Sequence, residues 1–193
     1  MRTGVFRAAL ALVLTLSACV TTSGPGRSFE PQHLRETGWV ATPDVPVMKQ
    51  TRELDCGPVA AAMLLGYWGR HVEPDALRAE AGMKPDRGLP AGTLRDLLRA
   101  RGLDAYLVEG ELADLERELR AGRPVLVGLA KAFSDKQALG HYEIVAGLNL
   151  EKGIVVTVDP ASGWREYPLD AFMKEWAPTK KLTLIASAPR GGG

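Results

Sequence analysis

Hydrophobic positions along the chain follow two different spacings, which separate a helical first half from a strand-rich second half. Residues 56–68 are apolar on nearly every side, a pattern typical of a helix buried in the centre of a domain. Amphipathic helical spacing then runs through residues 73–82, 93–102 and 111–122, and each of these segments ends in glycine. These segments predict that helices dominate the first half of the domain.

β-branched and aliphatic runs dominate the rest of the pattern. Strands are expected at residues 104–110, 123–130, 141–149, 153–160 and 181–188, with a short helix at 168–176. Two of these runs flank a turn from Leu150 to Gly153, which predicts an antiparallel hairpin. Because helices come first and strands cluster late, we predict an α+β domain with N-terminal helices packed on a C-terminal antiparallel sheet.

Composition sets the boundaries of this domain. Residues 20–44 are rich in Ser, Thr, Gly and Pro with little periodicity, so we expect residues 19–44 to form a flexible tether. A short extended segment, "VPVMKQ", leads from the tether into the first helix. Residues 189–193 are expected to form a disordered tail. The single domain that remains, residues 45–188, is long enough to bury a core.

The first residues are typical of an export signal. Arg2 and Arg7 form a basic region ahead of "AALALVLTL", an apolar run that is short for a membrane span. The following Leu16-Ser17-Ala18-Cys19 resembles the lipobox of bacterial lipoproteins. This resemblance implies removal of residues 1–18 and acylation, including palmitate, at Cys19, which anchors the chain in a membrane. The alternative is a soluble export signal in which Cys19 lies near the cleavage point by chance.

The residue after Cys19 indicates which membrane to expect. Val20 follows the cysteine, and in lipoproteins that this sequence resembles, a residue other than Asp there implies the outer membrane. We therefore expect the domain to lie in the cell envelope, anchored by lipid to the outer membrane and facing the periplasm.

Charge says little about partners, whereas the cysteine count is informative. The 24 basic and 23 acidic residues give a net charge of +1, and no basic face for nucleic acid is evident. If lipid takes Cys19, Cys56 is left without a disulfide partner. Free cysteines are commonly small buried core residues, so the neighbours of Cys56 must decide between a structural and a chemical role.

Those neighbours favour a reactive thiol. Cys56 opens the apolar helix, where the positive end of the helix dipole favours thiolate over thiol. Asp55 is a candidate N-cap, which would keep its carboxylate turned towards the helix N–H groups and away from the sulfur. Gly57 places no side chain beside the sulfur and is expected to leave room for a substrate carbonyl.

A base and an orienting acid can be found among the strands. Of the three histidines, His33 and His71 are expected to be solvated, whereas His141 opens a strand after the polar segment "KAFSDKQALG". Asp159 ends the next strand, and in an antiparallel hairpin the start of one strand lies beside the end of the other. An aspartate there can orient the imidazole towards a thiol. Gln50, upstream of the helix, is a candidate oxyanion donor.

Together these residues resemble the papain-like cysteine peptidases. The order of Gln50, Cys56, His141 and Asp159 matches, as does the sequence of helices before sheet. The nearest likeness is to the bacteriocin-processing peptidases that cleave after double-glycine leaders, through "DCGPVAAAMLLGYWG", "RPVLVGL", "GHYEIVAGLN" and "VVTVDPASG". It covers most of the chain from about Val45 to Ala188.

The resemblance implies a role for each of these residues. Cys56 would be the nucleophile, His141 the base, Asp159 the orienting acid and Gln50 the oxyanion donor. Gly57 and Gly140 would border the substrate. A peptide or protein substrate cut through an acyl-thioester is implied, with small residues such as Gly-Gly before the cleaved bond. No cofactor or metal is implied, since one thiol and three scattered histidines make no ligand set.

Several alternatives stay open. Many relatives are fused to an ABC transporter, but this sequence shows neither a transmembrane domain nor a nucleotide-binding motif, so an envelope adaptor or a separate transporter is a candidate partner. The same residues could serve a peptidoglycan hydrolase or an acyltransferase, because sequence does not separate hydrolysis from transfer. A non-catalytic peptide-binding or protein-binding module is the third possibility.

Overall fold

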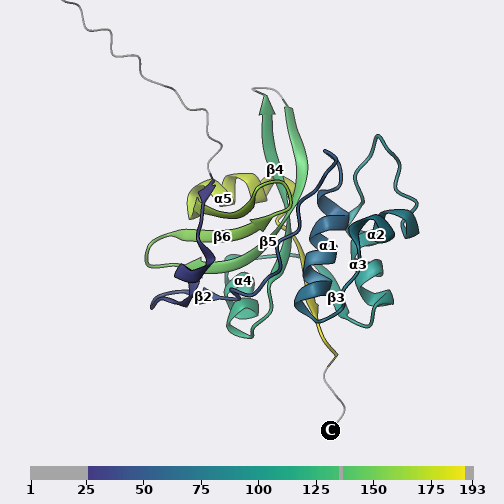
Figure 1. Ribbon diagram of the computed structural model, residues 1–193. Helices are drawn as coiled ribbons and strands as arrows, with labels where there is room; N and C mark the ends of the chain where they lie inside the picture. The colour runs from purple at the N-terminus through teal and green to yellow at the C-terminus, as the bar shows by residue number, and fades with distance from the viewer. Residues whose placement is uncertain (1–25, 135–136, 190–193) are drawn as a thin grey trace, which may run out of the picture.

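The computed structural model of the chain describes residues 26–134 and 137–189 (Figure 1). The predicted export signal, the lipid attachment at Cys19 and residues 190–193 of the predicted tail lie outside the described residues.

Within residues 26–134 and 137–189, five α-helices form where the apolar periodicity places them, and two 3-10 turns appear that the sequence did not indicate. The α-helices are α1 (Cys56–Tyr67), α2 (Pro74–Glu80), α3 (Ala91–Ala100), α4 (Leu112–Arg120) and α5 (Leu169–Trp176), and the turns are η1 (Pro31–Arg35) and η2 (Ala177–Thr179). Ten consecutive residues of α1 are buried, as expected of a helix with apolar residues on nearly every side. The predicted helices are therefore confirmed to within a few residues at their ends.

One antiparallel sheet holds all the strands of the described residues. They are β1 (Arg27–Ser28), β2 (Val40–Ala41), β3 (Asp104–Glu109), β4 (Val125–Ser134), β5 (Gln137–Asn149), β6 (Ile154–Asp159), β7 (Gly163–Pro168) and β8 (Leu182–Ser187). Their order across the sheet is β1-β7-β6-β5-β4-β8-β3, with β2 paired to β5. The predicted fold class, helices packed on an antiparallel sheet, is confirmed.

Helices cover both faces of this sheet. Because side chains alternate along a strand, Leu126 and Ile144 face a core built with α1, α2 and α3. Their neighbours Val125 and Val145 face a second core built with α4 and α5. In Figure 1, α1, α2 and α3 gather at one end of the sheet, and α5 lies over the other. The N-terminus of α1 is thereby held beside the strands β5 and β6.

The segment before residue 45 is packed against the sheet over its described part. β1 pairs with β7, β2 pairs with β5, and Leu34 of η1 is buried. The prediction of a flexible tether is therefore wrong for residues 26–44. Small and polar residues lowered the apparent periodicity, but two short backbone pairings and one apolar anchor suffice to hold the segment on the sheet.

Residues 131–134 and 137–140, the described parts of this polar segment, are also more regular than expected. We predicted strands only up to residue 130 and from His141 on, but the ladder between β4 and β5 extends from Val125↔Val145 out to Ser134↔Gln137. The resulting hairpin projects from the body of the molecule (Figure 1). Backbone pairing needs no apolar face, so polar composition alone was a poor guide to the ends of these strands. β7, like the two-residue strands β1 and β2, was not indicated by the sequence pattern.

Membrane-spanning character is not found among the described helices. Within residues 26–134 and 137–189, none of them combines the length and apolarity needed to cross a bilayer.

Candidate active site

Cys56 is fixed at the first turn of the buried helix. It is the first residue of α1 and only 6% exposed. The next residue, Gly57, faces inward: a Cβ there would lie 3.4 to 3.5 Å from Leu94, Leu89 and Tyr142. Leu89 and Tyr142 also line the cavity beside Cys56. The role of Gly57 beside the substrate stays a prediction.

Asp55 does not cap the helix. No side-chain capping hydrogen bond is formed, and its carboxylate instead pairs with Arg52 at 2.9 Å and Arg78 at 3.6 Å. The predicted cap is therefore wrong, because two guanidinium groups compete successfully for the carboxylate. The consequence for the thiol is the one expected from a cap, since the negative charge beside Cys56 is compensated.

The imidazole and the carboxylate meet as the hairpin predicted. His141 Nε2 lies 2.6 Å from Asp159 Oδ1, joining β5 to the end of β6. Asp159 is held in turn by the backbone N–H of Ala161, at 2.8 Å, and the hydroxyl of Ser162, at 2.5 Å. The carboxylate is therefore oriented by donors on both of its oxygens.

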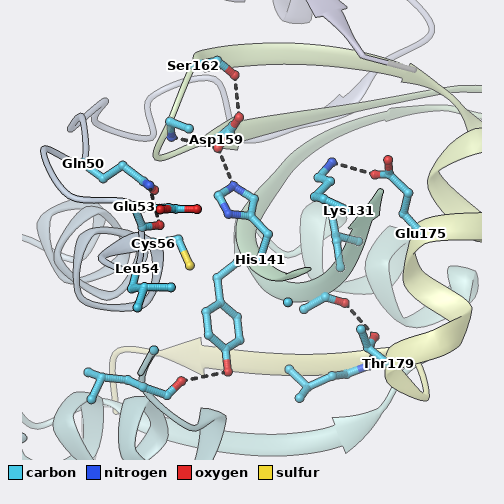
Figure 2. Close-up of a pocket in the computed structure, with 18 of the residues that line it drawn as sticks. Gln50, Glu53, Leu54, Cys56, Lys131, His141, Asp159, Ser162, Glu175 and Thr179 are labelled. Carbon is cyan, nitrogen blue, oxygen red and sulfur yellow. Dashed lines mark hydrogen bonds and ion pairs between the residues drawn. The ribbon is translucent and has the colours of Figure 1, made fainter. Parts of the chain in front are cut away.

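Cys56 completes the arrangement from the helical side. Its sulfur faces the His141 ring in Figure 2, and the thiol and imidazole are hydrogen-bonded. Because Asp159 occupies Nε2, Nδ1 is the nitrogen left for the sulfur. Three side chains from distant parts of the chain thus lie in one line of contacts: carboxylate, imidazole, thiol.

The contacts of His141 with Asp159 and Cys56 favour the protonated imidazole. Burial alone would lower the pKa of His141, but the Asp159 and Cys56 hydrogen bonds and charges outweigh it and raise that pKa to about 10. Burial alone would likewise raise the pKa of Asp159, whereas His141, Ser162 and the Ala161 N–H bring it down to about 2. Between these values the site holds an imidazolium beside a carboxylate. This arrangement can stabilise a thiolate and later supply a proton.

Gln50 reaches the site, but its amide is engaged elsewhere. Its Nε2 donates to the carbonyl oxygens of Arg52 and Glu53, at 3.2 and 3.0 Å. Its Oε1 is buried without a hydrogen-bond partner among the described residues. A role as oxyanion donor requires the amide to leave these carbonyls and turn to the substrate, and this role stays a prediction.

A cavity of about 850 Å³ runs through the site. Its walls include Gln50, Leu54, Cys56, Leu89, Gly140, His141 and Asp159. Gly140 also lines this cavity, and a Cβ there would meet nothing within 4 Å; its role beside the substrate stays a prediction. The other wall is formed near α5 by Lys131 and Glu175 (Figure 2).

A second charged cluster beside His141 escaped the sequence analysis. Glu143 is fully buried and accepts from Thr157 at 2.5 Å and from Tyr167 at 3.2 Å, while Lys131 Nζ lies 2.7 Å from it. The sequence could have placed Glu143 near His141, because residues 141 and 143 are two apart on one strand and therefore lie on the same face of the sheet. Lys131 and Tyr167 gave no comparable signal, because strand pairing alone brings them there.

Glu143 also bears on the question of a metal. Ligand atoms of His141, Glu143 and Asp159 all lie within 4.8 Å of one another. However, Glu143 is paired with Lys131, a cation that opposes metal binding at the same carboxylate. The hydrogen-bonding roles of these residues account for the cluster without an ion.

Comparisons with known proteins give the family and the fold. The sequence profile of the Peptidase C39 family matches residues 44–189. No curated protein sequence matches the chain significantly.

Several solved structures share the fold. The peptidase domain of Streptococcus ComA, a bi-functional ABC transporter involved in quorum sensing, is 18% identical, with 75% of this chain and 98% of that one covered and a TM-score of 0.64. A double-glycine-motif protease from an AMS/PCAT transporter, in complex with the leader peptide, is 23% identical over 76% and 92%, with a TM-score of 0.62. A C39-like peptidase from Bacillus anthracis is 18% identical over 77% and 97%, also with a TM-score of 0.62. The chain therefore has the papain-like fold of these peptidase domains.

Proposed function

This chain belongs to the Peptidase C39 family, and from that premise we propose that it cleaves peptide bonds through Cys56, His141 and Asp159. The observation that carries the proposal is their contact in one cavity: the imidazole binds the Asp159 carboxylate at 2.6 Å and the Cys56 thiol on its other side. In this arrangement the carboxylate orients the imidazole and the imidazole activates the thiol, as in other catalytic triads.

The chemistry follows from the charges in the site. The Cys56 thiolate attacks the substrate carbonyl carbon, and the negative charge moves to the carbonyl oxygen. N–H groups of the first turn of α1 have no intrahelical acceptor, so they can donate to this oxygen, together with the Gln50 amide if it turns inward. The His141 imidazolium then gives its proton to the leaving amine. Water, deprotonated by His141, attacks the acyl-thioester and releases the acid.

The proposed substrate is a peptide with small residues, such as Gly-Gly, before the cleaved bond. Support comes from the double-glycine-motif protease that shares the fold and was solved with its leader peptide. Cys56 is only 6% exposed, which favours a peptide whose backbone carries no bulky side chain next to the cleaved bond.

Location and anchoring are also part of the proposal. We infer that the chain is a lipoprotein acylated at Cys19 and that it acts in the cell envelope, on the periplasmic side of the outer membrane, on peptides delivered by an adaptor or transporter. Support comes from the basic and apolar residues before Leu16-Ser17-Ala18-Cys19. Metabolic labelling with an alkyne palmitate analogue should mark the full chain, and Cys19→Ser should abolish the label. Labelling that survives this change contradicts the inference.

The proposed chemistry is tested with matched peptides that differ only before the cleaved bond. The full chain should cut a Gly-Gly peptide faster than an Ala-Ala peptide and leave a Leu-Leu peptide intact, with products identified by mass spectrometry. Cys56→Ala should abolish cleavage, whereas Cys19→Ser should retain it in detergent-free protein. Addition of an amine acceptor separates hydrolysis from acyl transfer. Cleavage by the Cys56→Ala protein would refute the proposal.

A further inference from the structure

The buried carboxylate nearest to the proposed triad is Glu143, and it has no part in the chemistry described above. Its side chain is fully buried, and its oxygens lie within 4.8 Å of the ligand atoms of both His141 and Asp159. Two carboxylates therefore stand beside one imidazole. Only Asp159 is hydrogen-bonded to it among the contacts of the described residues.

We propose that Lys131 is a positioning residue that neutralises Glu143 and turns it away from His141, so that Asp159 alone orients the imidazole. The proposal rests on the proposed function of the triad. Lys131 Nζ lies 2.7 Å from Glu143 and 2.6 Å from Glu175, and it donates to the Tyr167 hydroxyl at 3.0 Å.

Both carboxylate oxygens of Glu143 have partners other than the imidazole. Thr157 of β6 and Tyr167 of β7 donate to its two different oxygens, and Lys131 reaches it from β4. Glu175 of α5 shares the same ammonium group. The charged and titratable groups that face Glu143 are therefore Lys131, Tyr167, His141 and Asp159, with Glu175 behind Lys131.

Lys131 is held in place as firmly as the carboxylate it balances. It forms two hydrogen bonds and an ion pair, and its Nζ also lies 4.4 Å from the centre of the Tyr167 ring, a favourable cation–π arrangement. These partners use the three N–H groups of an ammonium. Lys131 borders the cavity in Figure 2, but it has no donor left for a substrate, which points to a role inside the protein.

Loss of this cation should disturb the triad through Glu143. A buried carboxylate without a cation repels Asp159 or takes up a proton. In the second case it becomes a donor that can bind Asp159 and draw it from His141. Removing the carboxylate as well should remove the disturbance, so the double replacement predicts rescue.

The test is a double-mutant cycle on the full chain, with turnover of the Gly-Gly peptide and alkylation of Cys56 by iodoacetamide as readouts. Lys131→Met should lower kcat at least about tenfold with KM little changed, the signature of lost transition-state stabilisation rather than lost binding. Lys131→Arg, which keeps the charge, should stay within about threefold of wild type. Glu143→Gln and the double variant Lys131→Met/Glu143→Gln should also stay within about threefold. Lys174→Met, at an exposed lysine of α5, is the matched control and should behave as wild type.

Each result has a defined reading. A double variant as slow as Lys131→Met would overturn the proposal, as would a Lys131→Met protein with wild-type kcat. If Lys131→Met fails to fold, the double variant and Lys131→Arg still decide the matter: both leave Asp159 as the carboxylate that orients His141, so a folded variant of either kind with low kcat would overturn the proposal. Failure of the proposed function itself looks different: the wild-type chain then cuts none of the peptides, or Cys56→Ala cuts them equally well.

Discussion

Replacing Asp159 by Asn isolates the electrostatic part of the site, because it removes a charge and keeps the shape of the side chain. Asp159 Oδ1 lies 2.6 Å from His141 Nε2, and despite burial, which lowers it, the pKa of His141 is raised to about 10. A hydrogen bond to a charged group contributes about 1.5 to 3 kcal/mol, and about 1.36 kcal/mol corresponds to one pKa unit. The pKa of His141 in the variant should therefore fall by about one to two units, to about 8 to 9.

The direction of the shift in the pH profile follows from which protonation state of His141 is active. The thiolate–imidazolium pair needs protonated His141, so activity is lost as pH rises through this pKa. Losing the anion that stabilises the imidazolium moves the loss to lower pH. The same holds for stability: the contribution from the raised pKa of His141 is complete below the unfolded pKa of histidine, about 6.5, and disappears as pH rises through about 10.

The assay is kcat/KM for a fluorogenic Gly-Gly peptide from about pH 5 to about pH 11, since kcat/KM reports the free enzyme. Asp170→Asn is the control, because Asp170 is an exposed residue of α5 paired with Lys174, and it should keep the wild-type profile. If the alkaline limb of Asp159→Asn coincides with that of the wild type, the electrostatic account of the site is refuted.

Three further predictions concern single side chains. His141→Ala should slow alkylation of Cys56 near neutral pH, measured by mass spectrometry, and an unchanged rate would argue against an activated thiol. Gln50→Ala should leave alkylation unchanged but slow peptide turnover by about two to three decades, as loss of one oxyanion donor does; unchanged turnover would exclude that role. Tyr142→Phe removes the 3.1 Å hydrogen bond to the Leu89 carbonyl at the cavity wall, a loss of about 0.5 to 1.5 kcal/mol. It should raise KM by up to about tenfold, and an effect on kcat alone would contradict this.

The contact between His141 and Asp159 could be predicted from the sequence because it is a local property of a hairpin. Two β-branched runs around the turn at Leu150 to Gly153 fix an antiparallel pair, and antiparallel pairing places the start of one strand beside the end of the other. The structure has this pair, with Ile144 opposite Val158. The helix that begins at Cys56 could be predicted equally well, because a run of apolar residues of that length indicates a buried helix.

Contacts that join distant elements could not be predicted in this way. Asp55 looked like a cap because the alternative partner, Arg78, comes from a helix whose packing the sequence does not specify. Lys131 and Glu175 meet only because α5 lies over β4. Neither spacing nor composition encodes which charged side chains a packed helix will bring together, so the local hairpin was predicted and the charged cluster beside it was not.

The pairing of β1 with β7 limits the distance between Cys19 and the cavity. Gly26, immediately before β1, borders the cavity, and the Arg165 guanidinium binds its carbonyl. Gly26 is only seven positions after Cys19, a stretch that spans at most about 25 Å. For a chain acylated at Cys19, the segment between the lipid and the domain is short, and it joins the domain at the border of the cavity. If the proposed acylation holds, Gly26 at the border of the cavity lies no more than about 25 Å from the acylated residue.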